Sequence, residues 1–229
     1  MSVVRMGLIN KPDDWSMARF RAHWRENHAP LAARLPGLRE YVQNHVIDSE
    51  QRGISFKRGP EHLDGLSQLT FDSLQSMRSA IATEVGPALI EDENLFIGRL
   101  RIVTVEPHVV IAPPAPGKTL KRMSLLRRRE DVTPEVFAYE WQAVHGPLVR
   151  QLPGVLGYRQ NLIVGRQSPK GVDVGYEGLP IDGIVELWFS DTDAINAAFG
   201  SPIGIETMAH AATFIGEITT FLVDPFTVV

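Results

Sequence analysis

Large, mostly apolar side chains recur three and four residues apart between positions 16 and 35, the spacing of one helical face. The positions are Met17, Phe20, Trp24, His28, Leu31 and Leu35. Ser16 suits the N-cap of this helix, and Pro36-Gly37 suits its end. Pro30 has no amide proton for the carbonyl of Glu26, so we expect the helix to kink or restart near His28.

Short apolar runs predict the strands that surround this helix. They cover residues 3–10, 38–47, 65–71 and 96–105. The spacing of Leu74, Met77, Ile81 and Val85 predicts a second helix before the last strand. The expected order is therefore β-α-β-β-α-β, a split βαβ unit with both helices on one side of an antiparallel sheet.

The same order of elements occurs a second time. With an offset of 117, residues 5–44 align with 122–161 without a gap, and 15 of the 40 pairs are identical. With an offset of 118, Asp64-Gly65 meets Asp182-Gly183, and Phe96-Ile97-Gly98 meets Phe214-Ile215-Gly216. Asp191 suits the cap of a second-copy helix that Pro202 would break, and residues 214–223 would form the closing strand. Tandem duplication is the natural explanation.

The duplication predicts both the domain organisation and the fold. We expect a first repeat at residues 1–111, a proline-rich linker at 112–118 and a second repeat at 119–229. Helices cover one face of each sheet, so the other apolar face needs a cover as well. We therefore predict an α+β fold of two ferredoxin-like repeats whose sheets pack face to face, with a cavity or a packed core between them.

The motif shared by the two copies resembles that of a known family. Trp24, His28, Pro30, Pro36-Gly37 and Tyr41 all have partners at matching spacing in the second copy. This pattern resembles the EthD-like branch of the dimeric α+β barrel superfamily, over residues of about 3–107 and 120–225. Members are usually single repeats that pair as homodimers, so this chain resembles a fused dimer. Relatives in the wider superfamily include methylmuconolactone methylisomerase, muconolactone isomerase, polyketide cyclases, cofactor-free monooxygenases and haem-degrading enzymes.

Composition narrows the range of functions. The net charge of −4 provides no basic surface for nucleic acid or for an anionic membrane. The absence of cysteine excludes thiolate catalysis and counts against the methylisomerase reaction, whose site in the relatives uses a cysteine. The N-terminal residues do not form a secretory signal, and no apolar stretch is long enough to span a membrane. We therefore expect a cytoplasmic protein.

Two histidine–tyrosine pairs are the first candidates for chemistry: His28 with Tyr41, and His145 with Tyr158. Similarly spaced residues lie in the active site of the methylisomerase relatives. A histidine at a helix end and a tyrosine on the next strand are able to move a proton beside a carbonyl group. The alternative is structural, with each histidine bonding a backbone carbonyl that the proline leaves free. The structural interpretation is slightly favoured.

Positions that differ between the copies give a second set of candidates. His45 corresponds to Leu162, Gln68 to Glu186, and Thr70 to Trp188. If Gln68 and Glu186 face the space between the sheets, the two ends of that space differ, and we expect His45, Gln68, Glu186 and Trp188 to contact a ligand. Glu186 would be either a buried base or the partner of an arginine such as Arg159 or Arg122.

Two further patterns are interpreted as structural. His23 and His28 are five residues apart, which places them on different faces of an α-helix and excludes metal chelation by the pair. The acidic run Glu91-Asp92-Glu93 is expected to lie on the surface.

The sequence supports one main function and two alternatives. The main hypothesis is a barrel without an obligatory cofactor that binds a small apolar oxygenated molecule, such as a lactone, a phenol or a polyketide-like ring, between the sheets. It would be an isomerase, cyclase or oxygenase of a catabolic pathway, with the histidines as acid or base. The alternatives are a non-catalytic binding or assembly protein and a haem-binding barrel. Exposed helices also leave room for a homodimer of the whole chain.

Overall fold

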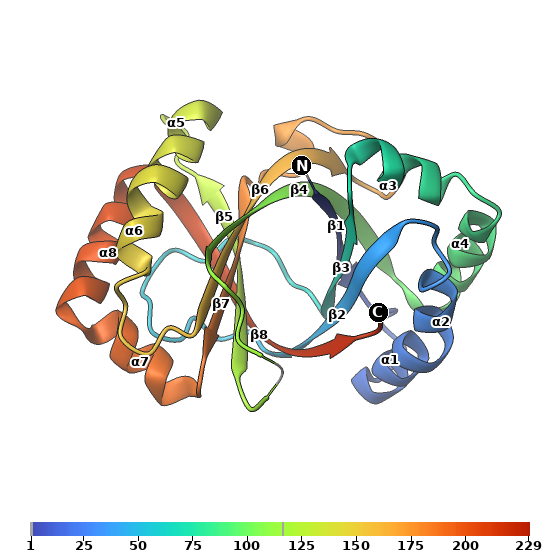
Figure 1. Ribbon diagram of the computed structural model, residues 1–229, viewed down its shortest axis with the longest axis horizontal. Helices are drawn as coiled ribbons and strands as arrows, with labels where there is room; N and C mark the ends of the chain where they lie inside the picture. Colours follow the sequence, from blue (N-terminus) through green and yellow to red (C-terminus); the bar gives the residue numbers. More distant parts are fainter. Residues whose placement is uncertain (1, 116) are drawn as a thin grey trace.

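The computed structural model describes residues 2–115 and 117–229. Eight antiparallel strands form one closed barrel with helices packed outside it (Figure 1). The strand order around the barrel is β1-β3-β2-β8-β5-β7-β6-β4. Each repeat contributes four consecutive strands of this ring, so the two sheets face each other as predicted.

The first repeat contains the segments from β1 to β4. Its elements are β1 (Val3–Asn10), α1 (Met17–His23), a π-helical turn (Trp24–His28), α2 (Ala29–Ala32), β2 (Leu38–Asp48), β3 (Gly65–Phe71), α3 (Leu74–Ile81), α4 (Val85–Phe96) and β4 (Arg99–Ile111). The side chain of Ser16 caps α1 by accepting from the amide of Arg19. The predicted interruption near His28 is the π-helical turn.

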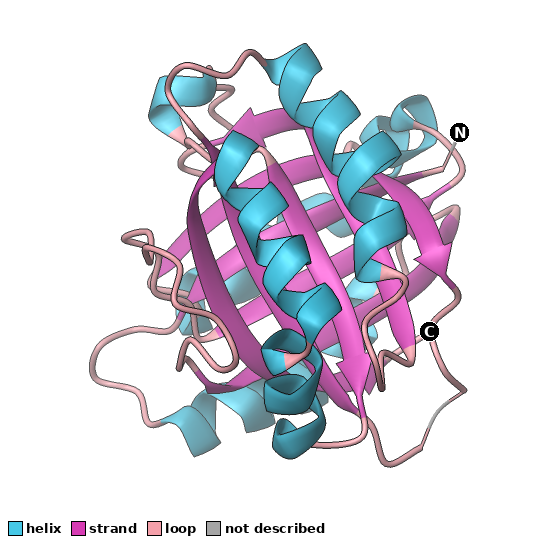
Figure 2. Cartoon of the chain, turned by 90° about the vertical axis from the view of Figure 1, so that its left-hand side faces the viewer, coloured by secondary structure: helices cyan, strands magenta, loops and turns pink. Residues whose placement is uncertain are grey.

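The second repeat runs from β5 to β8. Its elements are β5 (Leu120–Arg128), α5 (Pro134–Tyr139), a π-helical turn (Glu140–His145), α6 (Gly146–Val149), β6 (Gly157–Gln167), a 3-10 turn (Tyr176–Gly178), β7 (Gly183–Phe189), α7 (Thr192–Gly200), α8 (Pro202–Phe214) and β8 (Ile215–Thr227). Its helices cover the outer face of its own four strands (Figure 2).

The second helical region of each repeat differs from the prediction. It holds two consecutive helices, α3 and α4 or α7 and α8. Pro202 ends α7 but is also the first residue of α8, where its missing amide proton costs nothing. Phe96 and Phe214, which were assigned to strands, are the last residues of α4 and α8. The extra helices matter because they cover the outer face of each sheet beside the motif histidines.

The interior of the barrel is a packed core, one of the two outcomes expected between the sheets. Apolar side chains from both repeats fill it, among them Met6, Met123 and Phe221, each fully buried. The repeats join at two seams, where β2 pairs with β8 and β4 pairs with β6. No helix in the described part of the chain is long and apolar enough to cross a membrane.

Candidate functional site

The π-helical turn of the first repeat brings two histidines to the same side. The amide of Ala29 donates to the carbonyl of Trp24, five residues earlier, because a wider turn has opened ahead of Pro30. Residues five apart lie nearly above one another in such a turn. His23 and His28 therefore share a face, and the expectation that they point apart is wrong because it assumed regular α-helical geometry.

Asp92 of α4 bridges these two histidines. His28 Nδ1 donates to Asp92 Oδ2 at 2.8 Å, and His23 Nε2 lies 2.8 Å from Asp92 Oδ1. Burial opposes ionisation of this carboxyl, but the hydrogen bonds from His28 and His23 outweigh it and lower the pKa of Asp92. Asp92 is 9% exposed, so its assignment to the surface is also wrong. It is spaced three residues after Leu89 and four before Phe96 on the buried face of α4, a signal that the sequence analysis missed.

The second repeat has a different set at the equivalent positions. His145 Nδ1 lies 3.3 Å from Nδ1 of His210, and His210 Nε2 lies 3.1 Å from Glu140 Oε2. His210 thus occupies the position of Asp92, and Glu140 that of His23. Burial, with a smaller effect of His210, lowers the pKa of His145 to about 3. His145 is held as a neutral imidazole with no carboxylate in contact.

The motif tyrosines lie beside the motif tryptophans. The hydroxyl of Tyr41 accepts from Trp24 Nε1 at 2.9 Å and from Gln43 Nε2 at 3.1 Å. Burial raises the pKa of Tyr41, so its hydroxyl keeps its proton. Within residues 2–115 and 117–229 no group accepts that proton. In the second repeat Gln160 Nε2 donates to the hydroxyl of Tyr158 at 2.8 Å.

A cavity lies between the sheet of the first repeat and its helices. Its volume is about 50 Å³, room for a few water molecules. The polar and ionisable residues that line it are Arg5, His28, Tyr41, Ser67, Glu93 and Lys170. The first hypothesis placed His28 and Tyr41 in a cavity between the two sheets, and this location is wrong. Both side chains lie on the helix-covered face, because the alternation along β2 turns Tyr41 and Gln43 away from the barrel interior.

An equivalent cavity of about 40 Å³ lies in the second repeat and holds His145 and Tyr158. Its lining is largely apolar, and Ile54 of the first repeat closes part of it. Arg122 also lines it, and burial lowers the pKa of this guanidinium to about 10. The two histidine–tyrosine pairs thus belong to two separate cavities on opposite sides of the molecule.

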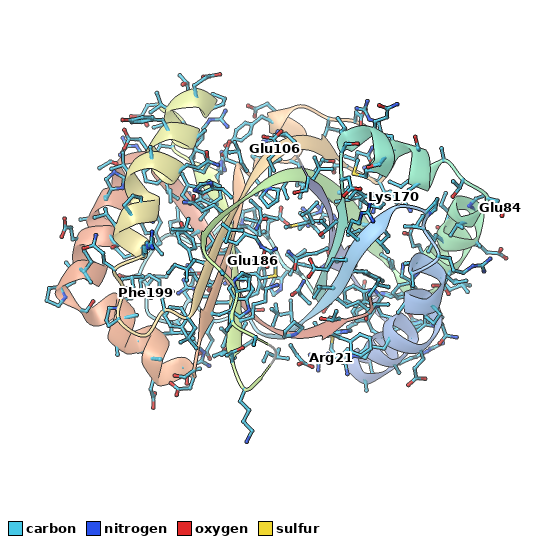
Figure 3. All side chains as sticks on the ribbon, in the orientation of Figure 1. Arg21, Glu84, Glu106, Lys170, Glu186 and Phe199 are labelled. Atoms are coloured by element: carbon cyan, nitrogen blue, oxygen red, sulfur yellow. The ribbon has the colours of Figure 1, made fainter. Side chains whose placement is uncertain are left out.

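Three of the other candidates, Gln68, Glu186 and Trp188, lie inside one end of the barrel instead. Glu186 lies among the strands at the centre of the view in Figure 3 and is fully buried. Its carboxylate lies 2.6 Å from Lys121 Nζ and accepts from Arg159 Nε at 2.8 Å and from Gln68 Nε2 at 2.9 Å. Burial opposes its ionisation, but Lys121 and Arg159 outweigh this and hold the pKa of Glu186 well below its usual range. The arginine-paired alternative for Glu186 is the one found.

Trp188 belongs to the same interior cluster. Its ring lies 5.1 Å from Lys121 Nζ and 5.9 Å from the guanidinium carbon of Arg159. Lys121 also donates to Asn44 Oδ1 at 2.8 Å and to Gln68 Oε1 at 2.9 Å. These partners satisfy the cluster internally, so its geometry is that of a packed polar network.

His45 lies apart from both cavities. Its ring packs edge-on against Trp24 at 4.7 Å and accepts from Arg25 Nε at 3.2 Å. Burial and the charge of Arg25 lower the pKa of His45 to about 3. In each repeat, the histidine and the tyrosine of the candidate pair therefore line the same cavity. The other four candidates lie elsewhere: His45, Gln68, Glu186 and Trp188.

Family comparison agrees with the duplicated architecture. The model of the EthD domain matches residues 12–99 and again 129–217, together more than half of the chain. The chain belongs to the EthD family. Its two EthD repeats correspond to the two halves of the barrel. A comparison with the curated proteins gives no match.

Solved structures share the fold of this EthD protein over nearly its whole length. An anthrone oxidase-like protein has a TM-score of 0.65 at 13% identity, covering 99% of this chain and 93% of its own. A protein assigned as a monooxygenase from Lactobacillus acidophilus NCFM reaches 0.58 at 11% identity, with coverages of 99% and 95%. A dye-decolorizing peroxidase from Bacteroides thetaiotaomicron reaches 0.55 at 9% identity, with coverages of 96% and 92%. At these identities the similarity establishes the fold alone.

In the described residues no group of three or more histidine, cysteine, aspartate or glutamate side chains has the arrangement of a metal site. The side chains around the first cavity offer chemistry of their own. An imidazole held by a carboxylate, a neutral tyrosine hydroxyl and a guanidinium are suited to proton transfer and to holding a partly negative oxygen.

Proposed function

We propose that the first cavity binds a small, largely apolar molecule with a carbonyl group and moves a proton on the carbon next to it. The observation that carries this proposal is His28, which lines the cavity with Tyr41 and is held from behind by the carboxylate of Asp92. The proposal makes the chain a cofactor-independent enzyme of the isomerase or cyclase type. It keeps the substrate class expected from the sequence and moves the site from between the sheets to the helix-covered face.

Each group has a defined part in this reaction. Asp92 accepts from His28 Nδ1, which fixes the tautomer and leaves the lone pair of His28 Nε2 as the base. His28 takes the proton from the carbon, and the electron pair of the C–H bond moves to the carbonyl oxygen. Tyr41, whose hydroxyl already accepts two hydrogen bonds, donates its proton in a hydrogen bond to that oxygen. Return of the proton from His28 to another carbon completes an isomerisation.

The second cavity differs from the first in a way that supports different roles for the two repeats. With a pKa of about 3, His145 is a much weaker base than an ordinary imidazole. Its neighbour His210 offers no negative charge to stabilise an imidazolium. We assign the His145 cavity a packing role, which is the structural alternative for the motif histidine applied to one repeat only.

The test is exchange of carbon-bound protons with deuterated solvent. A panel of small ketones, lactones and phenols is incubated with the protein in D2O, and deuterium incorporation is followed by proton NMR. Replacing His28 by Gln should lower the rate about a hundredfold or more, and the matched control His145→Gln should leave it unchanged. No exchange with any panel member, or an equal loss in both variants, would overturn the proposal.

Asp92 acts in this scheme as a positioning residue. Asp92→Asn should lower kcat about tenfold or more with little change in KM, and Asp92→Glu should restore part of the rate. Equal losses for Asn and Glu would show a merely structural role.

The two alternatives have their own readouts. A non-catalytic binding protein predicts that a panel member perturbs NMR signals around the cavity without exchanging protons. The space of about 50 Å³ beside His28 holds only a few water molecules, so the proposed substrate requires the helices to move apart, and haem requires a much larger movement. Titration with haemin tests this directly, because a bound haem would give a shifted Soret band that His28→Gln abolishes.

A further inference from the structure

Arg5 is a buried cation in the first cavity. The residue is 9% exposed and lines the cavity beside Tyr41 and Ser67. Over the residues that the structure describes, no side chain or carbonyl accepts a hydrogen bond from its guanidinium. Burial lowers its pKa, which the charge of Glu93 opposes in part. A guanidinium has five N–H donors, and leaving them unpaired in a buried position is unfavourable.

The equivalent arginine of the second repeat, Arg122, is paired in part, although its Nε has no partner among the described residues. Arg122 Nη1 donates to the carbonyl of Arg52 at 3.2 Å, and its guanidinium packs on the ring of Phe199 at 4.9 Å. Local groups thus take up part of the charge of Arg122. Arg5 differs because no local partner takes its donors and because the cavity that it lines also holds His28.

A second cation reaches the same cavity from the other repeat. Lys170 belongs to the segment between β6 and β7, yet it lies beside the helices of the first repeat (Figure 3). Its amide donates to the carbonyl of Leu100 at 3.0 Å, and its ammonium group pairs with Glu93. The Lys170–Glu93 pair also lines an outer pocket of about 340 Å³. Five residues line both spaces, so the outer pocket adjoins the cavity: Ile90, Glu93, Ile97, Leu100 and Lys170.

The charges of this region do not balance. Arg5 and Lys170 supply two positive charges, and Glu93 is the one carboxylate paired with either of them among the described residues. Asp92 is already engaged by His23 and His28. The remaining lining is mainly aliphatic, including Ile9, Leu35 and Leu89. One further negative charge on an apolar body would complete this arrangement.

We infer that the ligand of the first cavity is a small monocarboxylate with an apolar body, whose carboxylate binds to Arg5 and Lys170, the two cations that line the cavity. This inference rests on the proposed function and narrows its substrate to an enolisable keto acid or a lactone acid. Glu93 occupies the place beside Lys170 until the ligand carboxylate arrives. The second repeat then contributes a binding residue to the site of the first, so neither repeat holds the complete site.

Butyrate and its neutral counterpart butyramide are the probes, because they differ in charge but hardly in shape. Binding is followed at pH 7 through the Nε–Hε resonance of Arg5 and the backbone resonances of α4 in the isotope-labelled full-length protein. Butyrate should shift these resonances saturably, whereas butyramide should not. Arg5→Met should weaken butyrate binding about tenfold or more.

Glu93→Gln is the variant that separates binding from misfolding. Removing this internal competitor should tighten butyrate binding about two- to fivefold, a gain that damage to the fold does not produce. Arg122→Met is the matched control and should leave the shifts around Arg5 unchanged. The inference is overturned if both probes bind equally, if butyrate shifts only the Arg122 cavity, or if Glu93→Gln weakens binding. In any of these cases a positive deuterium-exchange result would leave the proposed function standing.

Discussion

Asp92 and His210 occupy equivalent positions in the two repeats and give the motif histidines opposite surroundings. His28 contacts a carboxylate, whereas His145 contacts a second imidazole. The backbone around them is alike, down to the π-helical turn in each repeat. The difference between the surroundings of the two histidines therefore arises from single side chains on α4 and α8.

Substituting His210→Asp should transfer this difference to the second repeat. A carboxylate beside His145 stabilises its protonated form, so the pKa of His145 should rise from about 3 by about one to three units. An NMR titration of the His145 ring resonances measures the change, with His210→Asn as the neutral control. A rise of equal size in the Asn variant would show that the carboxylate charge is not the cause.

Two buried neutral histidines should make the protein sensitive to mild acid. The pKa values of His45 and His145 are both lowered to about 3 in the folded chain, below the ordinary value of 6.5. The unfolded chain therefore binds more protons as the pH falls below 6.5, and each histidine should remove about 1.4 kcal/mol of stability per pH unit. Urea unfolding between pH 6.5 and 5.5 tests this, because Glu186 in the unfolded chain takes up its proton only nearer to the ordinary pKa of 4.5. His145→Gln should reduce the slope by about half, and a flat wild-type profile would contradict the prediction.

Glu186 should be essential to the stability of the barrel interior. Glu186→Gln leaves Lys121 and Arg159 buried with no carboxylate between them, so the free energy of unfolding should fall by about 3–5 kcal/mol. The double variant with Lys121→Met removes one uncompensated charge and should lose less than the sum of the two single variants. Denaturant unfolding of the four proteins measures this coupling. A loss below about 1 kcal/mol for Glu186→Gln would mean that water reaches the cluster.

Gly65 should tolerate no side chain. A Cβ there would overlap the ring of Trp24, so Gly65→Ala must push this ring away from Tyr41. We expect a loss of about 1–3 kcal/mol in stability and a change in tryptophan fluorescence. Gly200→Ala is a control, because a Cβ at that position meets no atom within 4 Å. Unchanged fluorescence in Gly65→Ala would show that the strand shifts instead of the ring.

Most of the fold was predictable from the duplication. Apolar spacing that matches between the copies predicted the strands and the first helix, and two copies of one half-covered sheet predicted that the sheets face each other. The extra helix of the second repeat was missed because Pro202 was interpreted only as a helix breaker. The same missing amide proton also suits Pro202 to the first position of α8. The candidate pairs His28–Tyr41 and His145–Tyr158 do line cavities, but sequence alternation alone gives no indication which face of β2 is covered by helices. Asp92 was missed because acidic runs are usually solvated. Its spacing from Leu89 and Phe96 was the available signal for its burial, but its pairing with both His23 and His28 depends on the wider turn at Trp24, which only the three-dimensional backbone reveals.

The covalent connection between β4 and β5 has a consequence for how such a site changes over generations. In a dimer of identical chains, every substitution appears twice, so an aspartate opposite one histidine is also present opposite the other. Joining the copies in one polypeptide removes this constraint, and each copy then accumulates changes independently. One copy is free to keep a polar cavity while the other becomes tightly packed. Each repeat also contributes a residue to the cavity of the other: Lys170 lines the first cavity, and Ile54 lines the second.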